Sequence, residues 1–506
     1  MPPKLHSSLL LAALPAILAP TPMRAQTVHE ETTATGLRIW DFPDDDADRF
    51  SIAVIVGVGA RDELRQHAGI AHFLEHVVLQ STKTRPGVFA DDELDGRGLD
   101  VNGFTSSEAT VYHVTGRAAH WRFMVDWLAD HVLSPRFDSA EVEGERRTVI
   151  EEITTNGPDF HAITYENLLY GDHPLARSIG GNPGTVGAVT VDDLRAFHRR
   201  FYHAGNMAVG FAGRVSRDAC MQAVSIAFAA APTGEPVIST APTPRFGDLW
   251  TNRNYAGDQT GSLLLGYHLQ CSRPEELTNL LVIEAYLGQR FFAVAREQRH
   301  LAYAPSVALT WGRDAQRLAF RCPTSERGNV APLAEIVADL VGELQKVDPG
   351  HLQDAIRRAR AGFVCESVDD LVEAMEYAAW VAWHGGAADS FTAAFDQVSA
   401  ADVAATATRW LRPEQRYSLS TTPLFGTPSS TWALVLVLTI FTAVVLRLYG
   451  GPLRAALAAR LRRHRRPRGR MLAMRSREPI KTVDAEEVAR SIQKFFEEED
   501  RRRGDR

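Results

Sequence analysis

Cysteine is scarce in this sequence of 506 residues and forms no recognisable motif. There are four cysteines, Cys220, Cys271, Cys322 and Cys365, and no two of them have the C-x-x-C spacing of redox and metal motifs. An oxidising compartment would permit disulfides, but the spacing alone does not define a pairing. We therefore expect single buried thiols, the ordinary state of cysteine in a chain of this length.

An excess of basic residues is also absent from the chain as a whole. The 55 Lys and Arg residues and 62 Asp and Glu residues give a net charge of -7 at pH 7. This charge offers no general argument for nucleic-acid binding, so we expect no nucleic-acid partner. With 45% hydrophobic and 23% charged residues the composition is that of a globular protein, and the length suggests about three units.

Long apolar runs are few, and the first lies at the N-terminus. Residues 1–26 are typical of a secretory signal peptide, with Lys4 as the positive start and an apolar run at 9–19. Ala25 is a small residue before a possible cleavage point. An uncleaved N-terminal anchor is the alternative.

The second apolar run, WALVLVLTIFTAVVL, begins at Trp432 and lies within residues 431–449. It is just long enough to span a bilayer, and a dense basic stretch follows at 460–470. Because positively charged flanks stay in the cytoplasm, the pattern predicts one transmembrane helix, a cytoplasmic tail and a main body on the other side. A buried core helix is the alternative.

Strand and helix signals alternate through the rest of the sequence and divide it into two similar α+β units. The order of elements is alike in both units, which is consistent with an internal duplication. The predicted segments are a signal peptide at 1–26, an N-terminal domain at 27–230, a linker at 231–244, a second domain at 245–422, a linker at 423–430, the transmembrane helix at 431–449 and a basic tail at 450–506. A short amphipathic helix in the tail, at 484–500, faces either a partner, the membrane surface or only solvent.

Apolar spacing predicts several individual elements. The run at 51–56 is nearly all apolar, which indicates a central strand. A long helix is expected at 139–156, with Ser139 as its N-cap. In the second unit we expect two separate helices, at 276–287 and 291–299.

One pentapeptide, His72 to His76, has the pattern H-x-x-E-H in apolar surroundings that favour a helix. Residues four apart share a helix face, so His72 and His76 can bind one metal ion. Zinc is the commonest metal for two histidines and a carboxylate with an open fourth position. Glu75 leans over the same face and can take a proton from a metal-bound water. The alternative is a helix that carries two histidines and binds no metal.

A catalytic zinc needs a third protein ligand, which is often a carboxylate. The predicted helix at 139–156 offers Glu145, Glu151 and Glu152. Glu145 and Glu152 are seven residues apart and therefore share a face, whereas Glu151 points elsewhere. This pair can place one carboxylate on the metal and the other behind a ligand.

Four segments together resemble the pitrilysin/insulinase family of zinc metallopeptidases, the inverzincins. They are GIAHFLEH at 69–76, NGFT at 102–105, RTVIEEI at 147–153 and REQRHLAY at 296–303. The resemblance is to the half-length branch that includes mitochondrial processing peptidase and bacterial processing-peptidase-like proteins. It covers roughly residues 35–421 and leaves out the predicted anchor and tail. It implies two α/β-sandwich-like domains that form a half-clamshell.

The resemblance also implies roles for individual residues. It implies that His72, His76 and Glu152 bind one zinc ion per chain. Glu75 would be the general base, and Glu145 matches the family's supporting carboxylate.

A further set of residues matches positions that hold the substrate in this family. Asn102 matches a residue beside the edge strand to which an extended peptide adds. Arg296 and Tyr303 match an Arg/Tyr pair that holds the substrate from the second domain. The alternatives are a surface salt bridge for Arg296 and a half-buried core position for Tyr303. The chain departs from the family at His300 and Gly103, where Gly and Ala are usual.

The expected function is therefore that of a zinc metalloendopeptidase acting on extended peptides or unfolded segments. The apolar segments place its body in the periplasm, anchored in a bacterial inner membrane. Because the second unit lacks a metal motif, a second copy or a related subunit is expected to complete the enclosure. The alternatives are a scavenger of leftover peptides, an inactive structural or receptor subunit of a membrane complex, and an anchored binding module whose function lies in the tail.

Overall fold

The computed structural model describes residues 28–43, 48–87, 90–156, 166–237, 240–254, 262–310, 312–323, 330–361, 368–387, 393–423 and 438–439. The chain divides into one compact unit at 1–430 and a second at 431–506. The predicted signal peptide, the tail and all but two residues of the predicted transmembrane helix lie outside the described residues. Among the helices that are described, none is long and apolar enough to cross a membrane.

The first half of the compact unit is built on a mixed six-stranded sheet with the order β1-β2-β6-β3-β5-β4. The strands are β1 His29–Thr32, β2 Arg38–Phe42, β3 Arg49–Val56, β4 Asp100–Thr105, β5 Thr110–Arg117 and β6 Met207–Gly213. As predicted from its apolar run, β3 is central and lies antiparallel between β5 and β6. The two edge strands are β1 and β4.

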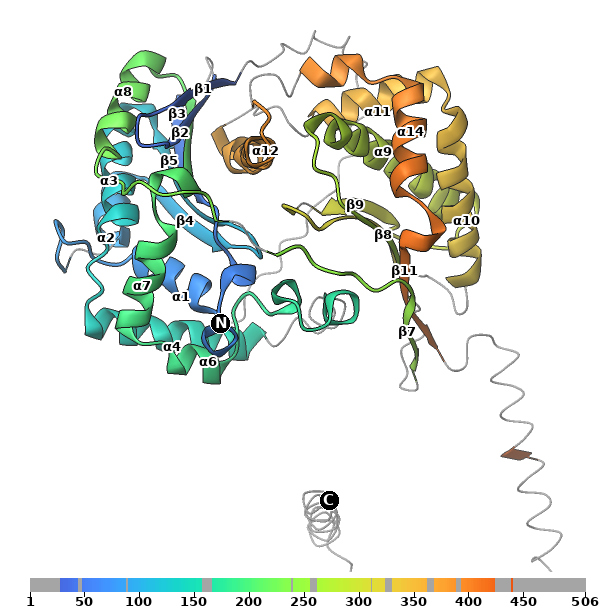
Figure 1. Cartoon of the computed structure of the whole chain (residues 1–506), viewed down its shortest axis with the longest axis horizontal. Coiled ribbons are helices and arrows are strands. Elements are labelled where there is room, and N and C mark those ends of the chain that lie inside the picture. Colours follow the sequence, from blue (N-terminus) through green and yellow to red (C-terminus); the bar gives the residue numbers. More distant parts are fainter. Residues whose placement is uncertain are drawn as a thin grey trace, which may run out of the picture. The chain divides into compact units, whose positions relative to one another are not determined.

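Helices from this half cover one face of the first sheet (Figure 1). They are α1 Ile70–Val78, α2 Ala90–Asp95, α3 Trp121–Leu133, α4 Ser139–Asn156, α6 Pro183–Ala188, α7 Val191–Phe201 and α8 Arg217–Ala227. The sequence places α4 correctly but not its cap. The backbone N–H groups of Ala140 and Glu141 donate to the Asp138 carboxylate, so Asp138 is the N-cap and Ser139 is the first helical residue.

The second half is built on a mixed five-stranded sheet with the order β7-β11-β8-β10-β9. The strands are β7 Gly247–Asn254, β8 Ser262–Leu269, β9 Ser306–Thr310, β10 Gln316–Pro323 and β11 Arg416–Pro423. The described helices are α9 Pro274–Phe292, α10 Val330–Glu343, α11 Pro349–Ala361, α12 Leu371–Trp383 and α14 Ala400–Trp410. The prediction of two helices at 276–287 and 291–299 was wrong. A single helix, α9, runs into a π-helical turn at Ala293–Gln298, because no residue between them breaks the hydrogen-bond ladder.

Apart from β1, which has no counterpart among the described strands of the second sheet, the two sheets repeat the same strand order, which supports the predicted internal duplication. In each, the first long strand pairs in parallel with the last strand of that half, as β2 does with β6 and β7 with β11. The remaining pairs are antiparallel and occur in the same order, so β9 is the counterpart of β4. The two-domain α+β architecture predicted from the sequence is therefore present, while the exact domain limits and the clamshell arrangement stay predictions.

Each half also contributes a segment to the other. Helix α12 packs on β3 and β6, where its apolar residues join Trp40 and Ile55 in a buried cluster. Figure 1 shows α12 on the side of the first sheet opposite α3 and α8. In return, Leu169 and Tyr170 of the first half pack with Tyr417 in the second sheet. The two halves are therefore interlocked, since each sheet buries part of its apolar face with residues of the other half.

The contact between α12 and β6 gives a test of this interlocking. A Cβ at Gly210 would lie 2.4 Å from the Sδ atom of Met375, so Gly210→Ala overpacks the contact. Met375→Ala removes a side chain that is 1% exposed and should cost about 2–4 kcal/mol of unfolding free energy. The double variant should be more stable than the sum of the single effects, because the new methyl group fills the vacated space. Denaturant unfolding of the four proteins measures this coupling, and strict additivity would contradict the contact.

Candidate metal centre

Helix α1 carries the H-x-x-E-H pentapeptide and is held firmly at its start. Gly69, the N-cap, has a φ of 94°, and a Cβ there would lie 2.5 Å from the Gly180 carbonyl oxygen, so only glycine fits. The buried Glu63 carboxylate accepts the backbone N–H groups of Gly69 at 2.7 Å and Ala71 at 2.9 Å. Apolar residues of α1 pack into the core, which fixes the face that carries the two histidines.

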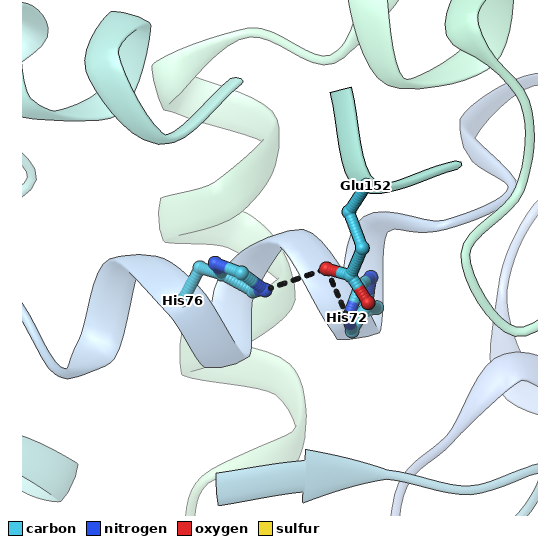
Figure 2. A group of neighbouring side chains, drawn as sticks. All are labelled: His72, His76 and Glu152. Carbon is cyan, nitrogen blue, oxygen red and sulfur yellow. Dashed lines mark ion pairs between the residues drawn. The ribbon is translucent and has the colours of Figure 1, made fainter. Parts of the chain in front are cut away.

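The two histidines of α1 and one glutamate of α4 converge on a single point (Figure 2). One carboxylate oxygen of Glu152, Oε2, lies 3.7 Å from His72 Nε2 and 3.5 Å from His76 Nε2. One ligand atom from each of the three residues lies within 4.8 Å of the others. In the described ranges these three residues are the one such group of histidine, cysteine and acidic residues.

The donor set fits a zinc ion. Ligand bonds of 2.0–2.2 Å in a tetrahedron require donors about 3.4 Å apart, close to the separations between Glu152 and the two imidazoles. Two neutral imidazoles and one carboxylate leave a fourth position open, as catalytic rather than structural zinc sites do. His72, His76 and Glu152 would therefore hold the metal, as the sequence predicts.

Glu145 contacts the ring nitrogen of His76 that faces away from Glu152. Its Oε2 atom is 3.2 Å from His76 Nδ1, so a proton on Nδ1 is donated to the carboxylate and Nε2 is left free to bind a metal. Glu145 thus contacts a ligand rather than the metal position. Glu151 is exposed and lies outside the group of three ligand candidates, as its place on α4 predicts.

Burial and charge shift the two histidine pKa values in opposite directions in the metal-free protein. Burial and the nearby His76 lower the pKa of His72, and Glu152 opposes them only in part. Burial also acts to lower the pKa of His76, but the hydrogen bond to Glu145 and the charges of Glu75 and Glu152 outweigh it and raise that pKa. Among the two histidine ligands, His76 is therefore the one at which protons compete more strongly with zinc.

The general-base candidate Glu75 is buried beside the edge strand β4. Its Oε2 atom accepts a hydrogen bond from Thr105 Oγ1 at 3.0 Å, and the residue is 6% exposed. Burial raises its pKa, while His76 and Thr105 act to lower it. A carboxylate with a raised pKa is better matched to proton transfer near neutral pH.

The departure at Gly103 acts on this same carboxylate. A Cβ at position 103 would lie 3.0 Å from Glu75 Oε1 and 3.2 Å from its Cγ, so glycine leaves room that alanine would remove. Asn102 next to it lies on β4 and is exposed, and its side chain accepts the Gly103 backbone N–H at 2.9 Å. Its predicted contact with substrate stays a prediction.

Arg296 and Tyr303 lie together, but on the second half of the chain. The Arg296 guanidinium carbon is 4.5 Å from the centre of the Tyr303 ring, and Arg296 donates to the Tyr303 carbonyl oxygen. Tyr303 is 71% exposed, so it is not a core aromatic, and no salt bridge to Arg296 occurs among the described residues. Their predicted role in holding substrate stays a prediction.

The departure at His300 leaves the turn in the conformation that favours glycine. His300 has a φ of 52°, in the left-handed region, and its Nδ1 atom lies 3.0 Å from the Arg296 carbonyl oxygen. The backbone at position 300 therefore has a conformation that glycine adopts more readily than histidine. A non-glycine residue there costs about 1 kcal/mol, which the hydrogen bond helps to offset.

Sequence reasoning missed two residues that shape the site, Glu63 and Thr105. Glu63 lies six residues before the N-cap that it supports. This is not the spacing of a capping box, so the local sequence does not predict the contact. Thr105 is inside the NGFT segment, but its contact with Glu75 depends on β4 lying beside α1. Both contacts are tertiary and have no local sequence signal.

The contact between Glu145 and His76 predicts a specific defect. Glu145→Gln should weaken zinc binding about 10- to 100-fold, because the amide no longer orients the imidazole as an anionic acceptor does. Glu143→Gln, on the same helix and in an exposed pair with Arg146, is the matched control and should bind zinc normally. Competition titration with a chromophoric chelator measures both, and equal affinities for the two variants would contradict the assigned contact.

Zinc affinity should also depend on pH in a direction set by His76. Zinc requires the neutral imidazole, so the apparent dissociation constant should rise about tenfold per pH unit for each proton displaced below the His76 pKa. Because that pKa is raised, the loss should begin at a higher pH than for an unperturbed histidine. Glu145→Gln should move the onset to lower pH. Zinc titrations at several pH values measure the onset, and an unmoved onset would count against this cause.

Comparison with known protein families gives a consistent result. Residues 43–179 match the family described as Insulinase (Peptidase family M16), and residues 188–359 match the Peptidase M16 inactive domain. An uncharacterised zinc protease of Mycobacterium tuberculosis is 32% identical over 323 residues, which cover 62% of this chain and 72% of the relative. An uncharacterised zinc protease of Bacillus subtilis, YmxG, is 30% identical over 263 residues, covering 50% of this chain and 63% of the relative.

Solved structures share the fold at lower sequence identity. A protease from Helicobacter pylori superposes with a TM-score of 0.66 at 21% identity, covering 79% of this chain and all of that one. The periplasmic protease PqqL from Escherichia coli gives a TM-score of 0.63 at 17% identity, covering 81% of this chain but 49% of PqqL. With the H-x-x-E-H helix and its glutamate in place, the chain belongs to the M16 insulinase/pitrilysin family of zinc proteases, in its half-length bacterial form.

Proposed function

We propose that this protein is a membrane-anchored zinc endopeptidase that cleaves extended peptides or unfolded segments on the periplasmic side of a bacterial inner membrane. One observation supports the activity above all. In the ligand group of His72, His76 and Glu152, the two histidines share helix α1 with Glu75, whose buried carboxylate lies beside the edge strand β4. We infer one zinc ion per chain, because the part of the chain that the structure describes holds one such group of ligands.

The edge strand suggests how substrate is held. β4 pairs with β5 on one side and has no strand on the other in the described sheet. An extended peptide can add there as a further strand, with affinity from main-chain hydrogen bonds and little demand on sequence. Asn102 is exposed on this strand and could contact such a peptide. Arg296 and Tyr303 would meet the substrate from the other half.

Each residue of the site has a distinct role in the proposed reaction. A zinc ion held by His72, His76 and Glu152 would supply a Lewis acid and lower the pKa of a water molecule. Glu75 takes a proton from the attacking water and passes it to the leaving amine. Burial raises the pKa of Glu75, which suits it to both transfers. Glu145 keeps His76 in the tautomer that presents Nε2.

The proposed location is inferred from the apolar segments at 9–19 and 431–449. The chain matches about half of PqqL, so an enclosure made of two halves would require a second copy or a related subunit. The full chain, purified in detergent, should cleave unstructured peptides in a chelator-sensitive reaction and run as an oligomer in light scattering. A zinc-loaded protein without peptidase activity would favour the structural or receptor role instead.

The membrane topology can be tested separately from the activity. A reporter that is active only in the periplasm should be active when fused after residue 425, and a cytoplasmic reporter should be active when fused after residue 506. The reverse pattern, or recovery of the whole chain in the soluble fraction, would overturn the proposed location without touching the proposed chemistry.

A further inference from the structure

The half of the chain without a metal motif inserts a charged turn into the half that has one. Gly312 is held in place by residues of its own half. Its carbonyl oxygen accepts the Trp380 indole N–H at 2.8 Å and the Gln316 side-chain N–H at 2.7 Å. The Arg313 carbonyl oxygen lies 2.6 Å from His384 Nε2. Arg313 and Asp314, which follow Gly312, are thus presented on a rigid turn before β10.

Asp314 contacts the loop that leads to the metal-site helix. Its two carboxylate oxygens accept the two terminal nitrogens of Arg61 at 3.0 and 3.1 Å, a bidentate pair. The Arg61 side chain is fully buried and also bonds to Glu108 and to the Thr240 carbonyl oxygen. Two residues after Arg61 comes Glu63, whose carboxylate holds the first N–H groups of α1.

Arg313 contacts the turn that follows Thr105. Its backbone N–H donates to Glu108 Oε2 at 2.7 Å, and its guanidinium donates to the Glu108 carbonyl oxygen at 2.9 Å and to the Gly57 carbonyl oxygen at 2.6 Å. Glu108 lies in the turn between β4 and β5, three residues after Thr105, which bonds to Glu75. Arg313 therefore bridges the loop at 57–63 and this turn.

The loop and the turn are also bonded to one another. The backbone N–H groups of Ala60 and Arg61 donate to the carbonyl oxygens of Ser106 and Ser107 at 3.2 and 2.9 Å. A Cβ at Gly59 would lie 2.4 Å from the Ser106 carbonyl oxygen, so the approach is close. A displacement of either segment must move the other, and these two segments support α1 and Glu75 respectively.

We propose that Arg313 and Asp314 of the second half are positioning residues for the metal centre, acting through Arg61, Glu108 and the two segments that hold α1 and Glu75. This gives the half that lacks a metal motif a part in the reaction beyond holding substrate. The proposal rests on the proposed peptidase function for its kinetic consequence. Its structural consequence, the ordering of α1 and β4, does not depend on that function.

The test compares Asp314→Asn with a matched break between the halves. The control is Glu166→Gln, which disrupts the 2.7 Å pair between Glu166 and Arg317. The side chains of Asp314 and Glu166 are similarly exposed, at 26% and 22%, and both pairs join the two halves. The Glu166 pair, however, joins the second sheet to residue 166 rather than to the loop and the turn.

Hydrogen exchange on the zinc-loaded full chain is the first measurement. Asp314→Asn should raise amide exchange in β4 and in the first turn of α1 about tenfold, and Glu166→Gln should leave both unchanged. The zinc content should stay at the wild-type value in both variants. Unchanged exchange in β4 and α1, or an equal rise in the control, would overturn the proposal.

Steady-state kinetics is the second measurement. Asp314→Asn should lower kcat about tenfold at a nearly constant KM, since misplacing the base affects the transition state more than peptide binding. If Asp314→Asn fails to fold, Glu108→Gln takes its place and decides the question with the same measurements. A zinc-loaded wild type without peptidase activity would refute the proposed function, whereas the exchange data would still decide whether the turn positions the site.

Discussion

The Glu75→Gln variant is expected to retain its zinc and to lose about 10²- to 10⁴-fold in kcat. The amide keeps the size of the carboxylate and can still accept from Thr105, so the local structure should persist. It cannot take a proton from the attacking water. Peptide cleavage under saturating substrate, together with metal analysis of the same sample, measures both parts of the prediction.

The duplication supplies an unusually close control for this variant. Glu284 lies on α9, and its Oε1 atom accepts the backbone N–H of Leu309 on β9, the counterpart of β4, at 2.8 Å. Burial raises the pKa of Glu284 to about 7, and Glu284 is a half-buried helix carboxylate beside an edge strand. Glu284→Gln should leave kcat within about twofold of wild type. Normal turnover by Glu75→Gln would show that Glu75 is not the general base.

The second large effect is expected from the ligands themselves. His76→Ala and Glu152→Gln should each lose zinc. Their zinc affinity should fall by more than about 100-fold, which exceeds the loss expected for the supporting carboxylate in Glu145→Gln. The matched control for Glu152→Gln is Glu151→Gln, because Glu151 is the adjacent residue and is exposed. Metal analysis after dialysis against a weak chelator gives the zinc content of each variant.

The ligand variants and Glu75→Gln should fail in different ways. Removing a ligand should abolish both zinc and activity, and excess zinc should restore part of the activity of Glu152→Gln. No concentration of zinc should restore Glu75→Gln. If Glu152→Gln bound zinc as tightly as Glu151→Gln, the third ligand would have to be sought elsewhere, and the arrangement in Figure 2 would not be the metal site.

Removing the Glu152 carboxylate should have little effect on the stability of the metal-free protein. Glu152 lies near two histidines, one of which has a raised pKa, so its charge is partly balanced without metal. The apo protein should therefore tolerate Glu152→Gln with a change in unfolding free energy within about 1 kcal/mol. Loss of zinc in that variant is then a defect of binding and not of folding.

The local elements were predictable wherever the signal lies in neighbouring residues. The apolar run of β3, the helix that carries His72 and His76, and the whole extent of α4 follow from periodicity. The spacing of seven residues between Glu145 and Glu152 fixes their common face before any tertiary contact forms. Errors occurred at boundaries, as at Asp138, where two adjacent residues are both good caps and the backbone decides between them.

The candidate metal site was predictable for a related reason. Two ligands and the base come from one helix, so only α4 had to be brought alongside it. Residues that act through other segments were not predictable in this way. Glu63, Thr105 and Arg313 reach the site through contacts between strands, loops and halves that no local pattern encodes.

The sequence by itself determined the helix with its two histidines and the glutamate pair on α4, and four of its segments carry the resemblance that implies the family and its chemistry. The tertiary structure shows Glu152 beside both imidazoles and Glu145 behind His76, which is the assignment that the family resemblance implies and that helix spacing alone left open. It also decided that α12 covers the first sheet and that the turn at Arg313 reaches the loop before α1. The physical reason is range: helix periodicity acts over a few residues, whereas these contacts join segments up to about 250 residues apart, and burial in the folded chain selects them.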